Sequence, residues 1–357
     1  MSERLSHDDI SNALAELIVC FGVKEDTHFD DFHALLRKKD TVGCVQGIAS
    51  QLGLPIRINL SFVPKDFNPD YADGFRSSAL ARTDSSGRGI EGIVAQVSIP
   101  QHLPMFGSSG LQGFPIQVRV SEDCHAHPAA FLATMVHELS HVLLAALRSP
   151  HKDSEFHTDL VPILLGFRGF VRIGRKTIDR QTSGNTTTTR TTTYGYLTDA
   201  QFDFACNYVT GVLERHRRDR DLLLEMAEQV QRKLKKSSRS LATFRDYFRY
   251  LDIHPPERMR KKHAERVIQL HGRDYSLEWE RGITAARKSM GIAEAFARPQ
   301  DHHWPSDAEQ IKTQMRVLEA ASQELDNITQ AIAKDEHILR KYVGFTYRLR
   351  RTLGRHS

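Results

Sequence analysis

Cysteine is scarce in this sequence of 357 residues, and the spacing of its cysteines does not suggest disulfides. The four cysteines are scattered and form no CxxC pair, so reduced thiols are expected and a secreted protein is disfavoured. No apolar run approaches the roughly 20 residues that cross a bilayer. The start of the chain also lacks the basic and then apolar stretches of a secretion signal. We therefore expect a cytoplasmic protein.

An excess of acidic residues is also lacking. The net charge is +5 and the sequence pI is about 9.0, which raises the question of nucleic acid as a partner. The basic clusters at 258–266, 341 and 348–355 alternate with acids and show no aromatic-interleaved or zinc-finger pattern. A solvated helix face is the favoured interpretation. The segment 347–355 remains the exception that could dock on an acidic partner or nucleic acid.

The most informative motif is His-Glu-Leu-Ser-His at positions 137–141. Residues four apart lie on one face of a helix, so His137 and His141 can reach a single metal ion. Glu138 can then face a water in the open coordination position. Zinc lowers the pKa of such a water to about 7, and a carboxylate can take its proton. The motif predicts the metal-binding and catalytic helix of a zinc hydrolase.

The flanking residues support this interpretation. Between Pro128 and Leu147 the only charged residue is Glu138, as a buried active-site helix requires. Pro128 suits a first helical turn, and Ser149-Pro150 should end the helix. The alternative is a structural core helix whose polar side chains are satisfied by hydrogen bonds. A metal site is favoured because burying two histidines and a glutamate without one is costly.

A third zinc ligand is expected in the next segment. Ser154 or Asp153 can cap a second helix on which Glu155 and Asp159, four apart, share a face. Here the chain resembles the gluzincins, zinc metallopeptidases built on HExxH followed by ExxxD. The resemblance implies a zincin-like fold, one Zn²⁺ per chain, Glu155 as the third ligand and Asp159 as the hydrogen-bond partner of a ligand histidine.

Two other ligand assignments stay open at this stage. Glu155 follows the motif closely, and in a tight helix hairpin Asp159 would be more nearly level with the second histidine. His157 is also an alternative metal ligand, although it should point away from the face of Glu155 and Asp159. The pair His125 and His127 more simply lies in a surface loop.

Several segments read as strands. Residues 113–120 alternate apolar and polar, and residues 56–63 and 93–100 are similarly rich in β-branched side chains. The gluzincin resemblance implies that strand 116–120 is an edge strand, with a peptide or protein substrate bound along it by β-augmentation. Residues 170–173 read as a further short strand.

A threonine-rich run at 186–193 is β-prone but too polar for a core, so a mobile hairpin or loop is expected. Zinc peptidases need a donor that holds the oxyanion opposite the metal. Tyr196, Tyr194 or Arg190, which lie in or just after this run, could supply it, and Tyr196 is the candidate we retain. A buried structural tyrosine is the competing interpretation.

The chain changes character near residue 215, where long charged helices begin. Apolar residues recur every seven positions at 311, 318, 325, 332 and 339, which predicts a coiled coil. It could fold back on the helix at 213–236 or serve self-association or a protein partner. We predict an α+β fold in three parts: a helical region (1–55), a zincin-like domain (56–215) and a basic helical region (216–357).

These patterns predict a cytoplasmic zinc-dependent endopeptidase of narrow specificity. His137, His141 and Glu155 would hold the metal, and Glu138 would act as general base. The alternative is a non-catalytic, zinc-containing regulatory protein that binds nucleic acid or a protein through its basic C-terminal helices. The sequence offers no chemical hypothesis for residues 1–55.

Overall fold

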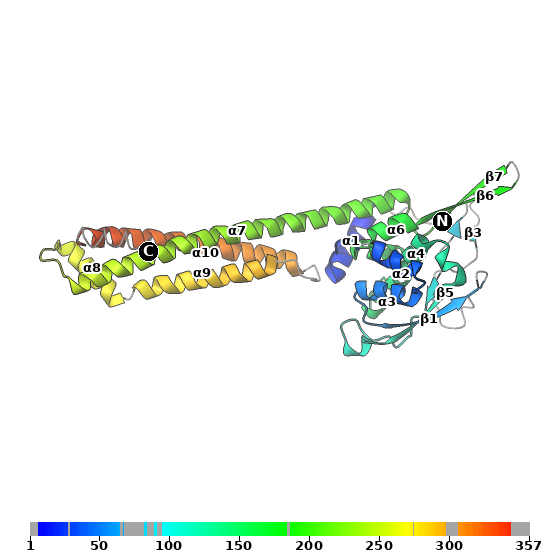
Figure 1. The fold of residues 1–357 in the computed structure, drawn as a ribbon, viewed down its shortest axis with the longest axis horizontal. Coiled ribbons are helices and arrows are strands. Elements are labelled where there is room, and N and C mark those ends of the chain that lie inside the picture. Colours follow the sequence, from blue (N-terminus) through cyan, green and yellow to red (C-terminus); the bar gives the residue numbers. More distant parts are fainter. Residues whose placement is uncertain are drawn as a thin grey trace. The chain divides into compact units, whose positions relative to one another are not determined.

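The computed structural model describes residues 6–27, 29–64, 67, 82–83, 89–90, 95–183, 186–273, 275–297 and 306–343. The chain forms two compact units, one of residues 1–214 with 303–305 and one of residues 215–302 with 306–357. The basic cluster predicted at 347–355 lies outside the described residues. The fold is a mixed α+β fold, as the sequence predicted (Figure 1).

Three helices open the first unit: α1 (His7–Phe21), α2 (Phe29–Arg37) and α3 (Thr41–Gln51). Ser6 caps α1 in a capping box with Asp9, and the side chain of Asp40 caps α3. Leu14 and Leu17 place the apolar face of α1 in the core. The polar side of α1 is left exposed.

A three-stranded sheet lies beside these helices, in the order β1 (Arg57–Val63), β5 (Pro115–Ser121), β4 (Ala95–Val97). Strand β5 runs parallel to β1 and antiparallel to β4. The prediction that 116–120 is an edge strand is therefore wrong. Both sides of this strand are paired, and its alternate residues Ile116, Val118 and Val120 are fully buried. Strand β4 is the edge on that side of the described sheet.

The threonine-rich run forms a hairpin. Strand β7 (Thr186–Thr193) pairs antiparallel with β6 (Lys176–Ser183) along its whole length, and short β2 (Arg82–Thr83) and β3 (Gly89–Ile90) complete a four-stranded sheet. β-Branched threonine suits the pleated backbone. The hairpin projects from the rest of its unit (Figure 1). Its last residue leads directly into residues 194–198.

The central helix of the unit is α4 (Pro128–Ala146), which packs on β4 and on α3. Every residue from Ala130 to Ala146 is buried. By length and composition α4 could cross a membrane, contrary to our expectation that the chain has no such run, but 94% of the apolar window is buried within the structure. The buried position of α4 accounts for its apolar composition, as in other core helices.

Two shorter helices cover α4: α5 (Glu155–Leu164) and α6 (Arg168–Gly174). Residues 170–173, predicted as a strand, lie within α6. Gly174 explains the close packing there, since a Cβ atom at this position would overlap the carbonyl group of Ala129 on α4. As a helix, the segment buries Phe170 fully and Val171 partly, and leaves Ile173 exposed.

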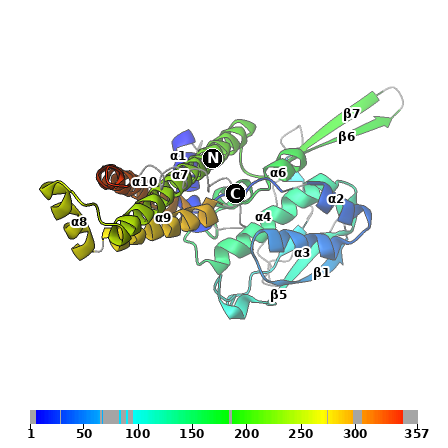
Figure 2. The same cartoon turned by 60° about the vertical axis from the view of Figure 1, so that its left-hand side comes forward.

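The second unit is helical. Helix α7 (Asp199–Ile253) continues into it from the first unit and is followed by α8 (Lys261–Arg273), α9 (Tyr275–Ala297) and α10 (Ser306–Arg340). Helices α7, α9 and α10 lie side by side in both views (Figure 2). The heptad residues of α10 are at most 1% exposed and share a core with residues of α7 and α9. Self-association through this seam stays a prediction.

Polar residues in and beside the apolar seam of α10 pair with α7 and α8. Lys233 on α7 contacts Asp326 at 2.5 Å, and the hydroxyl groups of Ser237 and Thr329 are 2.7 Å apart. The guanidinium group of Arg266 donates to Asp335, which is 1% exposed. Polar pairs inside an apolar seam fix the register of packed helices at some cost in stability.

Candidate metal and active site

Three side chains converge where α4 meets α5. The Nε2 atoms of His137 and His141 lie 3.1 and 3.3 Å from the same carboxylate oxygen, Oε2 of Glu155. Ligand atoms 2.0–2.1 Å from a tetrahedral zinc ion are about 3.3 Å from one another. The three side chains thus form a buried group that could hold a metal ion.

Local structure explains this convergence. Residues 137 and 141 are one helical turn apart on α4, so their rings share a face. After α4 ends, Arg148 adopts a positive φ of 58° that helps to reverse the chain. The hydroxyl of Ser154 then accepts a hydrogen bond from the backbone N–H of His157 and caps α5. Glu155 is therefore the first residue of the helix that packs against the two histidines.

The other ring nitrogen of each histidine has its own acceptor. Nδ1 of His137 lies 2.7 Å from Oδ1 of Asp159. Nδ1 of His141 lies 3.2 Å from the hydroxyl oxygen of Thr158, and that hydroxyl donates its proton to the carbonyl group of Ser154. Hydrogen bonds of this kind fix the ring orientation and the tautomer that leaves Nε2 available to a metal.

Asp159 also binds the backbone that follows the β6–β7 hairpin. Its second oxygen, Oδ2, accepts hydrogen bonds from the amides of Tyr196, at 2.5 Å, and Leu197, at 3.2 Å. Gly195 has a φ of 93°, and a Cβ atom there would lie 3.2 Å from the carboxylate of Asp159. A glycine is therefore suited to this turn. The carboxylate connects a ring of the metal-binding group to the loop 195–197.

Glu138 is fully buried, and neither of its carboxylate oxygens has a hydrogen-bond partner among the described residues. Burial raises its pKa to about 8, although the neighbouring His137 opposes the shift. A buried carboxylate without a partner is costly unless a bound group satisfies it. A metal-bound water next to the two histidines would do so, and the residues fit a zinc ion in this respect and in their donor atoms.

The charges of the group are strongly coupled. Burial alone would lower the pKa of His137, but the carboxylates of Asp159 and Glu155 raise it to about 10. Burial likewise opposes ionisation of Glu155, but the two histidines lower its pKa to about 2. A positive charge is thus favoured between these side chains, and a proton and a metal ion compete for that place.

The structure places Tyr196 beside this group. The ring of Tyr196 stacks on that of His137, with centroids 6.3 Å apart and planes at 24°, and its side chain is 42% exposed. Tyr194 is buried. The side chain of Arg190 lies outside the described ones. Tyr196 is thus positioned at the solvent side of the metal-binding group.

His157 lies apart from this group. Its ring stacks on that of His151, with centroids 3.8 Å apart, and its Nδ1 atom is 2.8 Å from the hydroxyl of Ser154. Burial and the neighbouring His151 lower its pKa. The ring of His125 contacts the hydroxyl of Thr41 instead. These histidines are not brought to the group of His137.

Sequence reasoning missed two contributors, Thr158 and the backbone of 195–197. Thr158 follows Glu155 by three positions and therefore shares its helix face, so helical spacing was a usable signal. The hydrogen bonds from residues 196 and 197 depend on a loop far along the chain, and no local sequence pattern predicts them.

Comparison with family models, curated proteins and solved structures finds no match. Function is therefore inferred from the side chains themselves.

Proposed function

We propose that this protein is a zinc-dependent endopeptidase of the gluzincin type. The observation that supports it most is the buried carboxylate of Glu138, which has no hydrogen-bond partner among the described residues, beside three converging ligand atoms. A purely structural zinc site would be closed by four protein ligands, whereas a hydrolytic site keeps one position open next to a base. Three protein ligands with an adjacent base match the hydrolytic arrangement.

His137, His141 and Glu155 would hold one zinc ion. Zinc in such a site is a Lewis acid that polarises a carbonyl group and makes water a nucleophile at neutral pH. Glu138 takes the proton from that water and later delivers it to the leaving amine. Its raised pKa suits both steps, because a base that titrates near neutral pH can accept a proton and release it again.

Tyr196 is the proposed oxyanion stabiliser. Its ring is stacked beside His137 and its backbone amide is held by Asp159. From this position its hydroxyl can donate a hydrogen bond to the developing negative charge on the substrate oxygen. The contact through Asp159 fixes the backbone of Tyr196 relative to the zinc ligands.

The proposed substrate is a peptide segment of a protein, bound in extended form. Strand β4, the described sheet edge that packs on α4, is buried at all three of its residues, so pairing of the peptide with β4 is not part of the proposal. Cleavage of few partners in the cytoplasm is part of the proposal, because an unrestrained protease would damage its own compartment.

The decisive test compares wild type with Glu138→Gln, both loaded with zinc. Peptide-library cleavage should fall by at least about 10³-fold in the variant, while zinc content measured by mass spectrometry stays the same. His102→Ala, an exposed histidine away from the group, is the control. Equal function in wild type and Glu138→Gln would reject the peptidase and favour a regulatory protein with structural zinc.

A further inference from the structure

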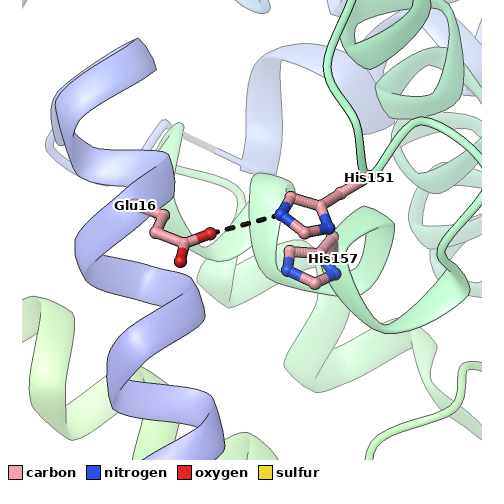
Figure 3. A group of neighbouring side chains, drawn as sticks. All are labelled: Glu16, His151 and His157. Atoms are coloured by element: carbon pink, nitrogen blue, oxygen red, sulfur yellow. Dashed lines mark hydrogen bonds and ion pairs between the residues drawn. The ribbon is translucent and has the colours of Figure 1, made fainter.

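A second cluster of metal-ligand side chains lies in the same unit. It consists of Glu16, His151 and His157, whose ligand atoms all lie within 4.8 Å of one another (Figure 3). Nε2 of His151 is 3.2 Å from Oε2 of Glu16. The two imidazole rings are stacked and nearly parallel, at 5°. None of the three belongs to the proposed catalytic group.

These side chains come from three places in the fold. Glu16 is exposed on α1, which packs against α5 through its apolar face. His151 lies in the turn between α4 and α5, where its backbone N–H donates to the hydroxyl of Ser149. His157 is in the first turn of α5. The cluster therefore links the N-terminal helix to the segment that carries Glu155.

One ring is already oriented for a ligand. Nδ1 of His157 lies 2.8 Å from the hydroxyl of Ser154, so Nε2 is the atom left for an ion. A nitrogen of each ring is on the side that faces the carboxylate of Glu16 (Figure 3). Because the rings are parallel, one of them must rotate about its Cβ–Cγ bond before both nitrogens can reach the same ion.

We propose that Glu16, His151 and His157 form a second zinc site. Two imidazoles and one carboxylate are a donor set that suits zinc and related divalent transition metals. The cluster is partly exposed, so its ion exchanges with solvent more readily than an ion among the buried side chains at His137. Three protein ligands leave the fourth position of this ion to water. No buried base lies among these three side chains, and the ion would join α1 to the first turn of α5 and steady the helix from which Glu155 reaches the catalytic group.

The test measures zinc stoichiometry and melting temperature on the full chain, with zinc chloride added to metal-free protein. Wild type should bind about two ions, and the melting temperature should rise further as the second binds. His151→Ala and Glu16→Gln should each bind about one ion and lose the second rise. His102→Ala, the matched exposed histidine, should behave as wild type.

The two proposals fail separately. His137→Ala should remove the tighter ion and leave the weaker one, whereas His151→Ala should do the reverse. Binding of one ion by wild type, or of two by both His151→Ala and Glu16→Gln, would overturn the second site. If His137→Ala kept the tighter ion, the peptidase proposal would fail while the second site stood. Glu16→Gln replaces an exposed side chain and keeps the result interpretable if His151→Ala folds poorly.

Discussion

His137 and Asp159 are joined by a hydrogen bond of 2.7 Å between Nδ1 and Oδ1, although one residue lies on α4 and the other on α5. The same carboxylate holds the amides of Tyr196 and Leu197 through its other oxygen. One side chain therefore sets the ring of a proposed zinc ligand and the backbone of the proposed oxyanion stabiliser. Any change at Asp159 should affect both.

Asp159→Asn should weaken zinc binding by about 10- to 100-fold. The amide can still accept from His137 through its oxygen, but its NH₂ group would then face the backbone N–H groups of Tyr196 and Leu197. The affinity is measured by competition with a chelator of known strength. Asp153→Asn, in the turn before α5, is the control. Unchanged affinity in Asp159→Asn would show that the carboxylate does not orient the ligand.

Thr158→Val should weaken zinc binding by about tenfold, because Nδ1 of His141 loses its nearer acceptor, the hydroxyl, and keeps only the carbonyl oxygen of Lys152 at 3.4 Å. Valine has nearly the same shape, so at this fully buried position the change removes the hydroxyl, with its hydrogen bond to the carbonyl group of Ser154, and opens no cavity. Thr158→Ser keeps the hydroxyl and should restore the affinity. If valine and serine variants bind zinc equally, the hydroxyl plays no part in holding the ring.

Tyr196→Phe should lower peptide turnover by about 10²-fold while zinc content stays unchanged, because the phenol would act on the substrate oxygen and not on the metal. Steady-state kinetics should place the loss mainly in kcat. The control is Tyr194→Phe, whose ring is buried nearby in sequence. A variant that loses zinc instead would assign Tyr196 to the support of His137.

Glu138→Gln should stabilise the metal-free protein, and increasingly so as the pH rises. The carboxyl has a folded pKa of about 8 against an ordinary pKa of 4.5, so its contribution is fully present below pH 4.5 and is lost as the pH rises through 8. Each unit of pKa difference corresponds to about 1.4 kcal/mol. The variant's advantage in free energy of unfolding should therefore grow to several kcal/mol.

Denaturant unfolding of both proteins between pH 5 and pH 9, after chelation, tests this. Zinc should reduce the difference, because the bound ion favours the ionised carboxylate. If the difference in free energy of unfolding stayed constant across this pH range, the pKa of Glu138 would be the same in the folded and unfolded chain. The proposal that Glu138 is a buried base beside an open metal position would then lose its support.

Gly174→Ala should destabilise the protein by about 2 kcal/mol or more, since the new methyl group would overlap the carbonyl group of Ala129. Helix α6 would have to move away from α4. Gly169→Ala, on the same helix but with open space around it, is the matched control and should be nearly neutral or slightly stabilising. Equal stability of the two variants would contradict the close helix packing.

The parts of the site that sequence could predict are those set by helical periodicity. His137, His141, Glu155 and Asp159 are placed by spacings of four along two neighbouring helices, and the α+β class followed from the strand and heptad patterns. The spacing rule holds because side chains on one helix face meet the same partner. It needs no knowledge of the rest of the chain.

The failures concern pairings between distant segments. Strand 116–120 was placed at a sheet edge, but β4 pairs with it, and alternation within a strand does not report how many neighbours it has. The cluster of Glu16 and His151 was missed because 135 positions separate them. Residues 170–173 form a helix because close packing against α4 outweighs the β preference of Val171 and Ile173.

The separation of 135 positions between Glu16 and His151 also distinguishes the two proposed sites in terms of chain entropy. The ligands of the first site lie within one short segment, since His137 and Glu155 are 18 positions apart. An ion held by Glu16 and His151 would close a loop of 135 positions. Loop-closure entropy grows as about (3/2)RT ln n, which gives the longer link about 1.8 kcal/mol more. An ion that stays bound to the unfolded chain would therefore restrict it more at the exposed site than at the buried one.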